Sequence, residues 1–274
     1  MLDKNEPPAA LPLPVRIDRP EAGIAVITLD RPHARNSLSL LMLDSLQAAI
    51  ATLSGDRSVH AVVLAATGPA FCAGHDLKEM TAARADADRG LAFFKRTMDA
   101  CAATMQAILN SPKPFIAAVQ GTATAAGCQL VATCDLAVAS DAAKFATPGV
   151  NIGLFCSTPM VALSRNVSRK QAMEMLLLGE LLSAKDAMAH GLVNRVVSPA
   201  TVMDEALGMA RQIASKSPLT VAIGKAAFYR QLEQPIAEAY AFASNVMVEN
   251  MMARDAAEGI GAFIDKRDPH WTGT

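Results

Sequence analysis

The sequence predicts an α/β fold in which a mostly parallel β-sheet is covered by helices and is followed by an all-helical C-terminal region. Short β-branched and small apolar runs alternate with longer segments whose apolar residues recur every three or four positions. The apolar content, 51% of 274 residues, is mainly Ala, Leu, Val and Met, which suit helices and buried parallel strands. After about residue 200, only the helical pattern continues.

Four short apolar runs are expected to be strands of this sheet. The first run, GIAVITL, ends at the turn-like pair Arg31 and Pro32, and the second, AVVLAA, ends at Thr67, Gly68 and Pro69. In order along the chain, the runs occupy residues 23–29, 61–66, 115–119 and 136–139. Because helical segments separate them, we expect parallel strands joined by crossovers.

Helical periodicity predicts two long helices between these strands, at residues 38–53 and 91–109. The first has one apolar stripe and ends at the sequence SGD. The second ends at SPKP and has a single apolar seam, formed by Leu91, Phe94, Met98, Cys101, Met105 and Ile108. A third, short helix is expected after the glycine- and alanine-rich residues 121–127.

The domain organisation predicted from these patterns has three parts. Residues 1–14 form a flexible arm, residues 15–200 form the α/β core, and residues 201–274 form a helical region. Within that region, four helices are expected at residues 201–217, 219–232, 236–253 and 256–266. Their Ala- and Met-rich faces suggest an oligomerisation element; the alternative is a layer that packs only on its own domain.

Composition excludes several classes of function. The net charge of −1 provides no basic footprint for nucleic acid, and 4% aromatic residues are too few for base-stacking surfaces. Five cysteines without a CxxC pair indicate a reduced intracellular protein that lacks a disulfide framework. The five histidines are scattered, with no HExxH, so we expect no metal site.

One uncharged stretch, residues 115–134, has the length of a membrane-spanning helix. It contains Gln120, Gln129 and three threonines, which lipid would not solvate, so we expect no membrane span. The first 14 residues have neither an apolar core nor an Arg-rich amphipathic pattern. We therefore expect no targeting segment and a cytoplasmic location.

Two segments combine the end of a strand, small residues and the start of a helix: residues 71–77, FCAGHDL, and residues 120–129, QGTATAAGCQ. The first N–H groups of a helix have no intrahelical partner, and small side chains let a ligand oxygen approach them. Two such turns can form an oxyanion hole, in which each donor contributes about 3 kcal/mol of transition-state stabilisation. The alternative is a pair of ordinary structural turns. Neither segment matches GxGxxG or a P-loop, which disfavours a dinucleotide site or a phosphoryl-transfer site.

These segments resemble the crotonase, or enoyl-CoA hydratase/isomerase, superfamily. FCAGHDLKEM is similar to its first oxyanion segment, and GTATAAGCQLVATCDLAVAS is similar to its second with the following strand. Further similar segments follow in the family's order: AKFATPG, LLSAKDAMAHGLVNRVV, IASKSPLTVAIGKAAF and EGIGAFIDKRDPHW. The resemblance covers about residues 15–270. It implies a core of repeated ββα units in a spiral and a C-terminal region that assembles homotrimers or pairs of trimers.

The resemblance also implies that the ligand is an acyl-CoA thioester, with no cofactor beyond the CoA of the substrate itself. In this family, two backbone N–H groups bind the thioester carbonyl and stabilise an enolate-like anion. By matching motifs, the donors here are the amides of His75 and Ala126, the second of which is commonly Gly in the family. Ala keeps the N–H and only narrows the approach.

Other positions are expected, by the same resemblance, to line the path of CoA. They are Ala34, Arg35, Ala73, Asp76, Leu77, Lys78 and Gly127. Lys78, with Lys266 or Arg267 from the C-terminal helix of a neighbouring subunit, is expected to bind the nucleotide phosphates through charge-assisted hydrogen bonds. For each of these cations, the alternative is an ordinary solvated surface charge.

The sequence departs from the family at the two glutamates that its active hydratases use for proton transfer. These catalytic positions fall on Gln129, which does not exchange a proton near neutral pH, and on Gly149, which has no side chain. A proton-transfer group contributes about 10²–10⁴ in rate, so we expect weak hydration. The aspartate position of the family's dienoyl isomerases falls on Ser157. Of the nearby carboxylates, Asp135 is expected to be structural and Asp141 solvated.

Few other groups remain for chemistry. The His75 side chain titrates in a range that suits a base, although a side chain beside such a turn often faces away. Cys156 or Ser157 as a nucleophile requires a basic partner, and none lies nearby in the sequence, so a packed small residue is the alternative. Gln129 is able to position a water or to hydrogen-bond an acyl group.

Two functions follow from these predictions. The first is an enzyme of the hydratase/isomerase family with weak or altered chemistry. The second is a protein that binds acyl-CoA thioesters but lacks efficient proton transfer. A serine peptidase on the same fold is discounted, because no Ser with a matched His and Asp is evident.

Overall fold

In the computed structural model, which describes residues 13–274, six strands form the larger of two sheets. Its strand order is β1 (Val15–Glu21), β2 (Gly23–Leu29), β3 (Val59–Ala66), β5 (Phe115–Val119), β7 (Leu136–Ser140) and β10 (Arg195–Val197). All neighbouring strands are parallel except β1, which pairs antiparallel with β2. The four strands predicted from the sequence are confirmed. Of the predicted arm, residues 1–12 lie outside the described residues.

The smaller sheet consists of four short strands. They are β4 (Ala70–Cys72), β6 (Thr122–Thr124), β8 (Lys144–Ala146) and β9 (Leu182–Ser183), in that order. The first three are parallel, and β9 runs antiparallel to β8. From β3 onward, three successive repeats add one strand to the large sheet, one to the small sheet and then helical structure, as in β5, β6 and α4 (Ala126–Thr133). The fold is therefore the α/β crotonase fold, with a core of repeated ββα units.

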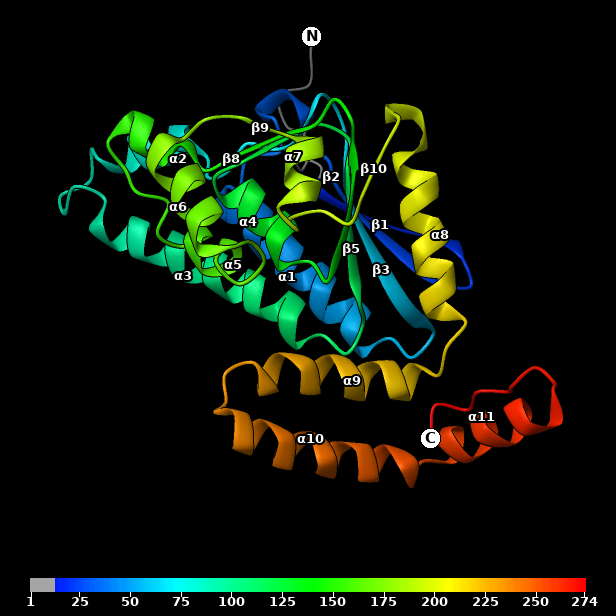
Figure 1. The fold of residues 1–274 in the computed structure, drawn as a ribbon. Coiled ribbons are helices and arrows are strands. Elements are labelled where there is room, and N and C mark those ends of the chain that lie inside the picture. The colour runs from blue at the N-terminus through cyan, green and yellow to red at the C-terminus, as the bar shows by residue number, and fades with distance from the viewer. Residues whose placement is uncertain (1–12) are drawn as a thin grey trace, which may run out of the picture.

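Alternate residues of the central strands face opposite sides of the large sheet, as the period of a β-strand requires. Ala25, Ile27 and Leu29 of β2 pack with α1 (Leu40–Gly55) and α3 (Leu91–Asn110) in the main core. Ile24 and Val26 point the other way, toward α8 (Val202–Ala214), which covers the second face. Figure 1 shows α8 alone on that side and the remaining core helices on the other.

The predicted seam of α3 is partly wrong. Leu91 is 71% exposed, whereas Thr97 and Thr104 are buried beside Cys101 and Met105. The threonine hydroxyls donate to the carbonyls of Phe93 and Ala100 in their own helix, so these side chains are buried with their hydrogen bonds satisfied.

Short helices connect the strands around the small sheet. They are α2 (Leu77–Ala83), α5 (Pro159–Leu163), α6 (Arg169–Leu178) and α7 (Ala184–Ala189). Short 3₁₀ turns occupy Pro32–Ala34, Pro148–Ile152 and Pro199–Thr201. The uncharged stretch at residues 115–134 is divided into β5, β6 and α4. In the described part of the chain, no helix has both the length and the apolar character needed to cross a bilayer.

The chain ends in α9 (Pro218–Gln231), α10 (Ile236–Met251) and α11 (Arg254–Asp265). Figure 1 shows them (orange to red) beneath the rest of the molecule, with α9 nearest to it and α10 outermost. Lys225 attaches α9 to the core: its ammonium donates to the carbonyls of Ile108 and Lys113 and to the carboxylate of Asp135. The tail is fixed by Asp255, which accepts hydrogen bonds from Ser217 and from residues 272–273.

Candidate active site

The candidate site lies where β4, β6 and β8 end. These strands are parallel neighbours, so their carboxyl ends meet at one edge of the small sheet. The first is followed by residues 73–77, the second by Ala125 and α4, and the third by Thr147 and the turn at Pro148–Ile152. Both segments singled out in the sequence, together with Gly149, are thus brought to one edge.

The first two segments touch backbone to backbone. A β-carbon on Gly74 would lie 2.8 Å from Cβ of Ala125 and 3.3 Å from the amide nitrogen of Ala126. A β-carbon on Gly127 would lie only 2.1 Å from the carbonyl oxygen of Cys72. No side chain fits at either glycine without separating the segments. Residues 74 and 127 therefore hold the two turns in direct contact.

The amide of His75 faces away from the neighbouring loop. Leu38 donates its N–H to the carbonyl of Gly74, and its own carbonyl accepts from the N–H of Asp76. These two hydrogen bonds make an isolated parallel bridge between Leu38 and His75. In such a bridge, the N–H of the central residue points away from the partner segment. It is therefore not used in pairing with Leu38.

The backbone is strained at the start of α4. Ala125 has φ 50° and ψ −120°, in a region that residues with a β-carbon rarely adopt. Its ψ sets the orientation of the peptide that contains the N–H of Ala126. Ala126 is the first residue of α4, so this N–H has no partner within the helix, and no side chain caps it. Strain is thus concentrated at one of the two expected donors.

The His75 side chain is half-buried. Burial lowers its pKa to about 4, so the imidazole is neutral near pH 7 and is a weak base there. Its Nε2 atom is enclosed and has no hydrogen-bond partner among residues 13–274. These properties do not favour the general-base role considered for His75.

Gln129 is buried in the first turns of α4, 5% exposed. The Cys101 thiol of α3 lies 3.9 Å from its Oε1 atom and donates to it. Burial raises the pKa of Cys101 to about 12, so the thiol stays protonated and remains a donor. This contact orients the Gln129 amide. The group at the first glutamate position is therefore a buried amide, which is unable to exchange a proton.

At the second glutamate position, the space for a side chain is occupied. A β-carbon on Gly149 would lie 2.9 Å from both the Sγ atom of Cys156 and the carbonyl oxygen of Leu154. Leu154 also donates its N–H to the carbonyl of Gly149, at 2.9 Å, which closes this turn. Residues 154 and 156 therefore lie against Gly149, and a side chain at this position would require them to shift.

The alternative nucleophiles and acids are placed unfavourably for catalysis. Burial raises the pKa of the Cys156 thiol, and the exposed Ser157 hydroxyl donates to the carbonyl of Phe155. Asp141 is exposed at the end of β7. Asp135 accepts from Lys225, Tyr229 and the N–H of Phe115, which makes it a structural residue, as the sequence predicts.

Beside the two turns, a cavity of about 280 Å³ is lined by Arg35, Pro69, Ala70, Ala73, Thr122 and Thr124. It brings together two of the residues expected along the CoA path, Arg35 and Ala73. Ala34 ends the neighbouring turn at Pro32–Ala34, and Leu77 and Lys78 are exposed in the first turn of α2.

Asp76 has a structural function that the sequence did not indicate. Its carboxylate caps α2 by accepting from the N–H groups of Lys78 and Glu79, and it binds Arg31 at 2.7 Å. Burial alone would raise the pKa of Asp76, but Arg31 and the two N–H groups together lower it. Only the three-dimensional contact identifies Arg31, because 45 residues separate it from Asp76.

Within one chain, Lys266 and Arg267 do not join the site. They follow α11, which Figure 1 shows beyond α9 and α10, away from α2 and α4. The guanidinium of Arg267 pairs with Glu258 of α11 at 2.7 and 3.0 Å. Their expected contact with a neighbour's ligand stays a prediction. In the described part, no cluster of three or more His, Cys, Asp or Glu is arranged to bind a metal ion.

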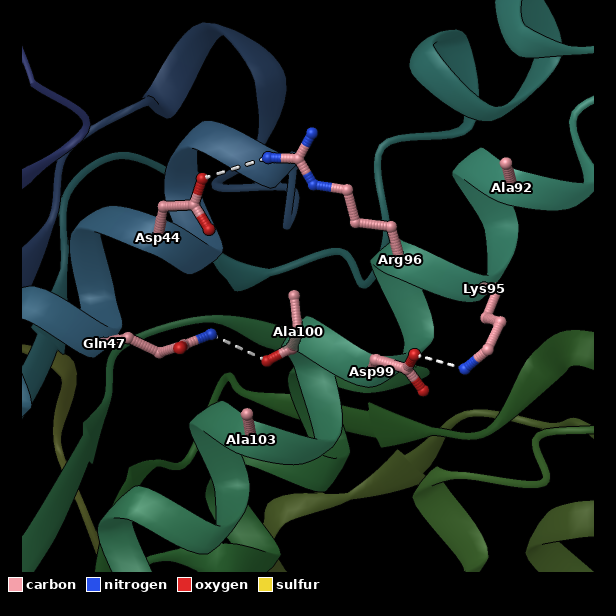
Figure 2. Close-up of a pocket in the computed structure, with 8 residues that line it drawn as sticks. All are labelled: Asp44, Gln47, Ala92, Lys95, Arg96, Asp99, Ala100 and Ala103. Carbon is pink, nitrogen blue, oxygen red and sulfur yellow. Dashed lines mark hydrogen bonds and ion pairs between the residues drawn. The ribbon is translucent and has the colours of Figure 1, made fainter.

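A larger hollow, of about 540 Å³, lies elsewhere, between α1 and α3 (Figure 2). Its rim has two exposed ion pairs, Lys95 with Asp99 and Arg96 with Asp44, and Gln47 donates to the carbonyl of Ala100. None of the predicted site residues lines it. Because the side chains of both ion pairs on its rim are exposed, the hollow is a groove on the surface of the two helices.

Comparison with known proteins identifies the family. A model of the enoyl-CoA hydratase/isomerase family matches residues 19–274. The chain belongs to this family. The resemblance predicted from the motifs is therefore confirmed, and it extends over nearly the whole chain.

Individual relatives are similar over the same length. Enoyl-CoA hydratase domain-containing protein 3, mitochondrial, of Rattus norvegicus is 49% identical over 254 residues, 93% of this chain and 83% of the relative. The crystal structure of the human protein of that name is 48% identical, with a TM-score of 0.89 over 94% of this chain and 100% of the other. An enoyl-CoA hydratase structure from Mycobacterium smegmatis is 54% identical, with a TM-score of 0.90 over 95% and 99%.

Proposed function

We propose that this member of the enoyl-CoA hydratase/isomerase family binds acyl-CoA thioesters and stabilises an enolate-like anion with the backbone N–H groups of His75 and Ala126. The observation that carries the proposal is the contact of the two turns, in which Gly74 lies against the amide nitrogen of Ala126. The strained backbone at Ala125 supports the proposal, because strained conformations of this kind cluster at active sites and ligand-binding sites. Two converging donors would stabilise charge that develops on one oxygen.

The chemistry that follows binding is weak or altered in this proposal. Gln129 replaces one proton-transfer group, and the second position, Gly149, is filled by the loop that contains Cys156. A binding protein without efficient hydration is the second candidate. It is favoured by the closed turn at Gly149, because neither of the two glutamate positions, Gln129 and Gly149, supplies a carboxylate.

The remaining parts of the proposal concern CoA and assembly. The cavity at Arg35 and Ala73 would take part of the CoA moiety, with Lys78 at its phosphates and Lys266 supplied by a neighbouring subunit. We propose assembly as a homotrimer or a pair of trimers, supported by the many exposed apolar residues of α9, α10 and α11. A cytoplasmic location stays a prediction; the rat relative has the word mitochondrial in its name.

Hydration of crotonyl-CoA, followed by the loss of enone absorbance, tests the chemistry. We expect turnover far below the value of about 10 s⁻¹ that is typical of enzymes, because both glutamate positions lack an acid. Turnover near that value would contradict the proposed weak hydration. Calorimetric titration with the same ligand then separates a binding protein from one that has no acyl-CoA site.

A backbone variant tests the donors themselves. Ala126→Pro removes one N–H at the first position of α4, and its ring adds carbons at a fully buried position beside Gly74, so the fold of the variant is checked first. We expect acyl-CoA affinity to fall at least tenfold, whereas Arg169→Pro, at the exposed first position of α6, leaves it unchanged. Equal affinity in both variants, with both chains folded by circular dichroism, would remove Ala126 from the oxyanion hole.

A further inference from the structure

The proposed donor N–H of His75 is oriented by a contact on the other side of its own peptide. This N–H and the carbonyl of Gly74 belong to one trans peptide, so they point in opposite directions. Leu38 donates its N–H to that carbonyl at 2.8 Å, and its own carbonyl accepts from the N–H of Asp76 at 3.2 Å. The direction of the His75 N–H therefore depends on where Leu38 lies.

Leu38 ends a loop, residues 31–38, that runs beside the turn just described. A third backbone hydrogen bond joins loop and turn, because Ala73 donates its N–H to the carbonyl of Arg35 at 3.0 Å. Arg35 and Asn36 have φ of 51° and 52°, a left-handed conformation that is uncommon for residues with a side chain. Two consecutive residues of this kind keep their conformation only where the surrounding structure holds them.

Asn36 holds the middle of this loop. Its side chain is fully buried, at 0% exposure, and its Oδ1 atom accepts from the N–H of Arg31 at 2.8 Å. Its Nδ2 atom donates to the carbonyls of Thr67 and Ala70, at 2.8 and 2.9 Å. The loop is thus attached to the connection between β3 and β4.

An ion pair joins the start of the loop to the turn. The Nη1 atom of Arg31 lies 2.7 Å from Oδ2 of Asp76, which also accepts from the hydroxyl of Ser37 at 3.3 Å. The side chains of the pair are 27% and 7% exposed, less than in any other arginine ion pair of residues 13–274. Charge-assisted hydrogen bonds are the strong ones, and little water competes for this one.

We infer that Arg31 is a positioning residue of the proposed oxyanion site. Through its ion pair with Asp76, it holds the loop in the place from which Leu38 orients the N–H of His75. The inference rests on the proposed function, because it requires that this N–H bind the thioester oxygen. Arg31 itself contacts neither the thioester nor the reacting atoms.

Two ligands that differ at one group test this inference. Butyryl-CoA has the thioester carbonyl, whereas S-butyl-CoA is a thioether in which a CH₂ group replaces that carbonyl. The ratio of their affinities, measured by calorimetric titration, reports what the oxyanion donors contribute, because partial unfolding weakens both ligands alike. In the wild-type chain we expect a ratio of about tenfold in favour of the thioester, as one or two net hydrogen bonds provide. Equal affinities, or no binding of either ligand, would refute the proposed function and the inference with it.

The variant Arg31→Gln is expected to lose most of this ratio. Arg19→Gln is the matched control, because Arg19 also forms an ion pair of 2.7 Å, with Asp56, and joins β1 to the end of α1 outside the site. It should keep the wild-type ratio. A ratio that survives in Arg31→Gln would overturn the inference and leave the proposed function intact.

Asp76→Asn separates the ion pair from the cap of α2 and provides the test if Arg31→Gln does not fold. Asparagine caps a helix as well as aspartate does, so α2 keeps its cap while the charge-assisted bond to Arg31 is lost. We expect Asp76→Asn, and the double variant with Arg31→Gln, to lose the same share of the ratio as Arg31→Gln alone. Arg31→Lys, which keeps the charge, should recover part of it. Losses that add up in the double variant, or a lower free energy of unfolding with an unchanged ratio, would overturn the positioning function of the pair.

Discussion

Two glycines determine how closely the oxyanion turns approach each other. At Gly74, φ is +87°, which favours glycine, and the residue lies against Ala125, which leaves no room for a side chain. Glycine is therefore required here for two reasons. At Gly127, the missing side chain alone matters, because the carbonyl of Cys72 occupies the place of a β-carbon. The proposed donors are thus able to lie close together because residues 74 and 127 have no β-carbon.

Substitution of Gly127 by Ala is expected to be strongly destabilising. The new β-carbon would lie 2.1 Å from a backbone oxygen, so β4 and α4 must separate. Overpacking of a core costs about 1–3 kcal/mol, and a clash with backbone belongs at the upper end of that range. The free energy of unfolding, measured with urea, reports the loss, and acyl-CoA affinity should fall with it.

The matched control is Gly224→Ala in α9, where a β-carbon meets nothing within 4 Å. It should stabilise the chain by about 0.5–1 kcal/mol, because alanine is the better helix former. If both variants had the same stability, the close approach of the two turns would be refuted.

The buried imidazole of His75 is expected to make stability depend on pH. Burial lowers its pKa to about 4 in the folded chain, whereas an unperturbed histidine titrates near 6.5. Between these values the unfolded chain binds more protons, so stability is complete above about pH 6.5 and is lost as the pH falls toward 4. Over that window the loss is about 3 kcal/mol. Urea unfolding at pH 7 and pH 5 measures most of it.

In the variant His75→Phe, this part of the pH dependence should disappear. The control His33→Phe, whose ring is exposed, should keep the wild-type dependence. If His75→Phe lost as much stability on acidification as the wild type, the imidazole would not be the group responsible.

At the scale of elements, the sequence predicts the strands and helices that are long and apolar. The strands at residues 23–29 and 115–119 are found with those boundaries, because unbroken apolar runs belong to strands buried on both faces. β1 was missed, because its residues, VRIDRPE, are mostly polar and lie at an edge. β4, β6 and β8 have only three residues each, too few for any periodicity.

Motifs indicate backbone positions at most. The turns at Gly74 and Gly127 touch, and Arg35 and Ala73 line one cavity, whereas the roles of these residues in binding stay a prediction. The sequence did not indicate that Cys156 occupies the space beside Gly149, that Arg31 binds Asp76, or that Thr147 lacks a partner. Each of these facts depends on side chains from separate elements, which spacing along the chain does not determine.

Helix α9 is attached by a buried ion pair with a predictable energetic cost. Lys225 and Asp135 are 2.7 Å apart, with side chains only 6% and 16% exposed. In Lys225→Met, the Asp135 carboxylate would stay buried without its cation, which destabilises proteins by about 3–5 kcal/mol. Chemical denaturation should reveal this loss.

The comparison variant is Lys95→Met, which removes an exposed ion pair with Asp99 on α3. We expect it to change stability by less than about 0.5 kcal/mol. A similar small effect in Lys225→Met would mean that α9 is held by its apolar contacts alone. The double variant Lys225→Met with Asp135→Asn should recover part of the loss, because the unpaired charge is then removed.

At the scale of the whole molecule, the C-terminal helices leave much apolar surface uncovered. Exposed side chains of α10, α11 and the turn between them include Tyr240, Met247, Met252, Phe263 and Ile264, of which Phe263 is 85% exposed. Monomeric proteins seldom expose so many large apolar residues on neighbouring elements. Figure 1 shows that these helices extend away from the core, which leaves them accessible to another subunit.

The proposed homotrimer predicts a mass by light scattering of three times 28.7 kDa, or six times for a pair of trimers. The double variant Met252→Glu with Phe263→Glu places charge on these helices, and burying that charge in an interface is costly. We expect the variant to shift toward a single chain while its circular dichroism stays unchanged. Leu91→Glu, at a comparably exposed leucine of α3, should leave the mass as it is in the wild type. A wild-type chain that stays monomeric at micromolar concentration would contradict the proposed assembly. It would also contradict the expected contact of Lys266 with CoA phosphates bound to a neighbouring subunit.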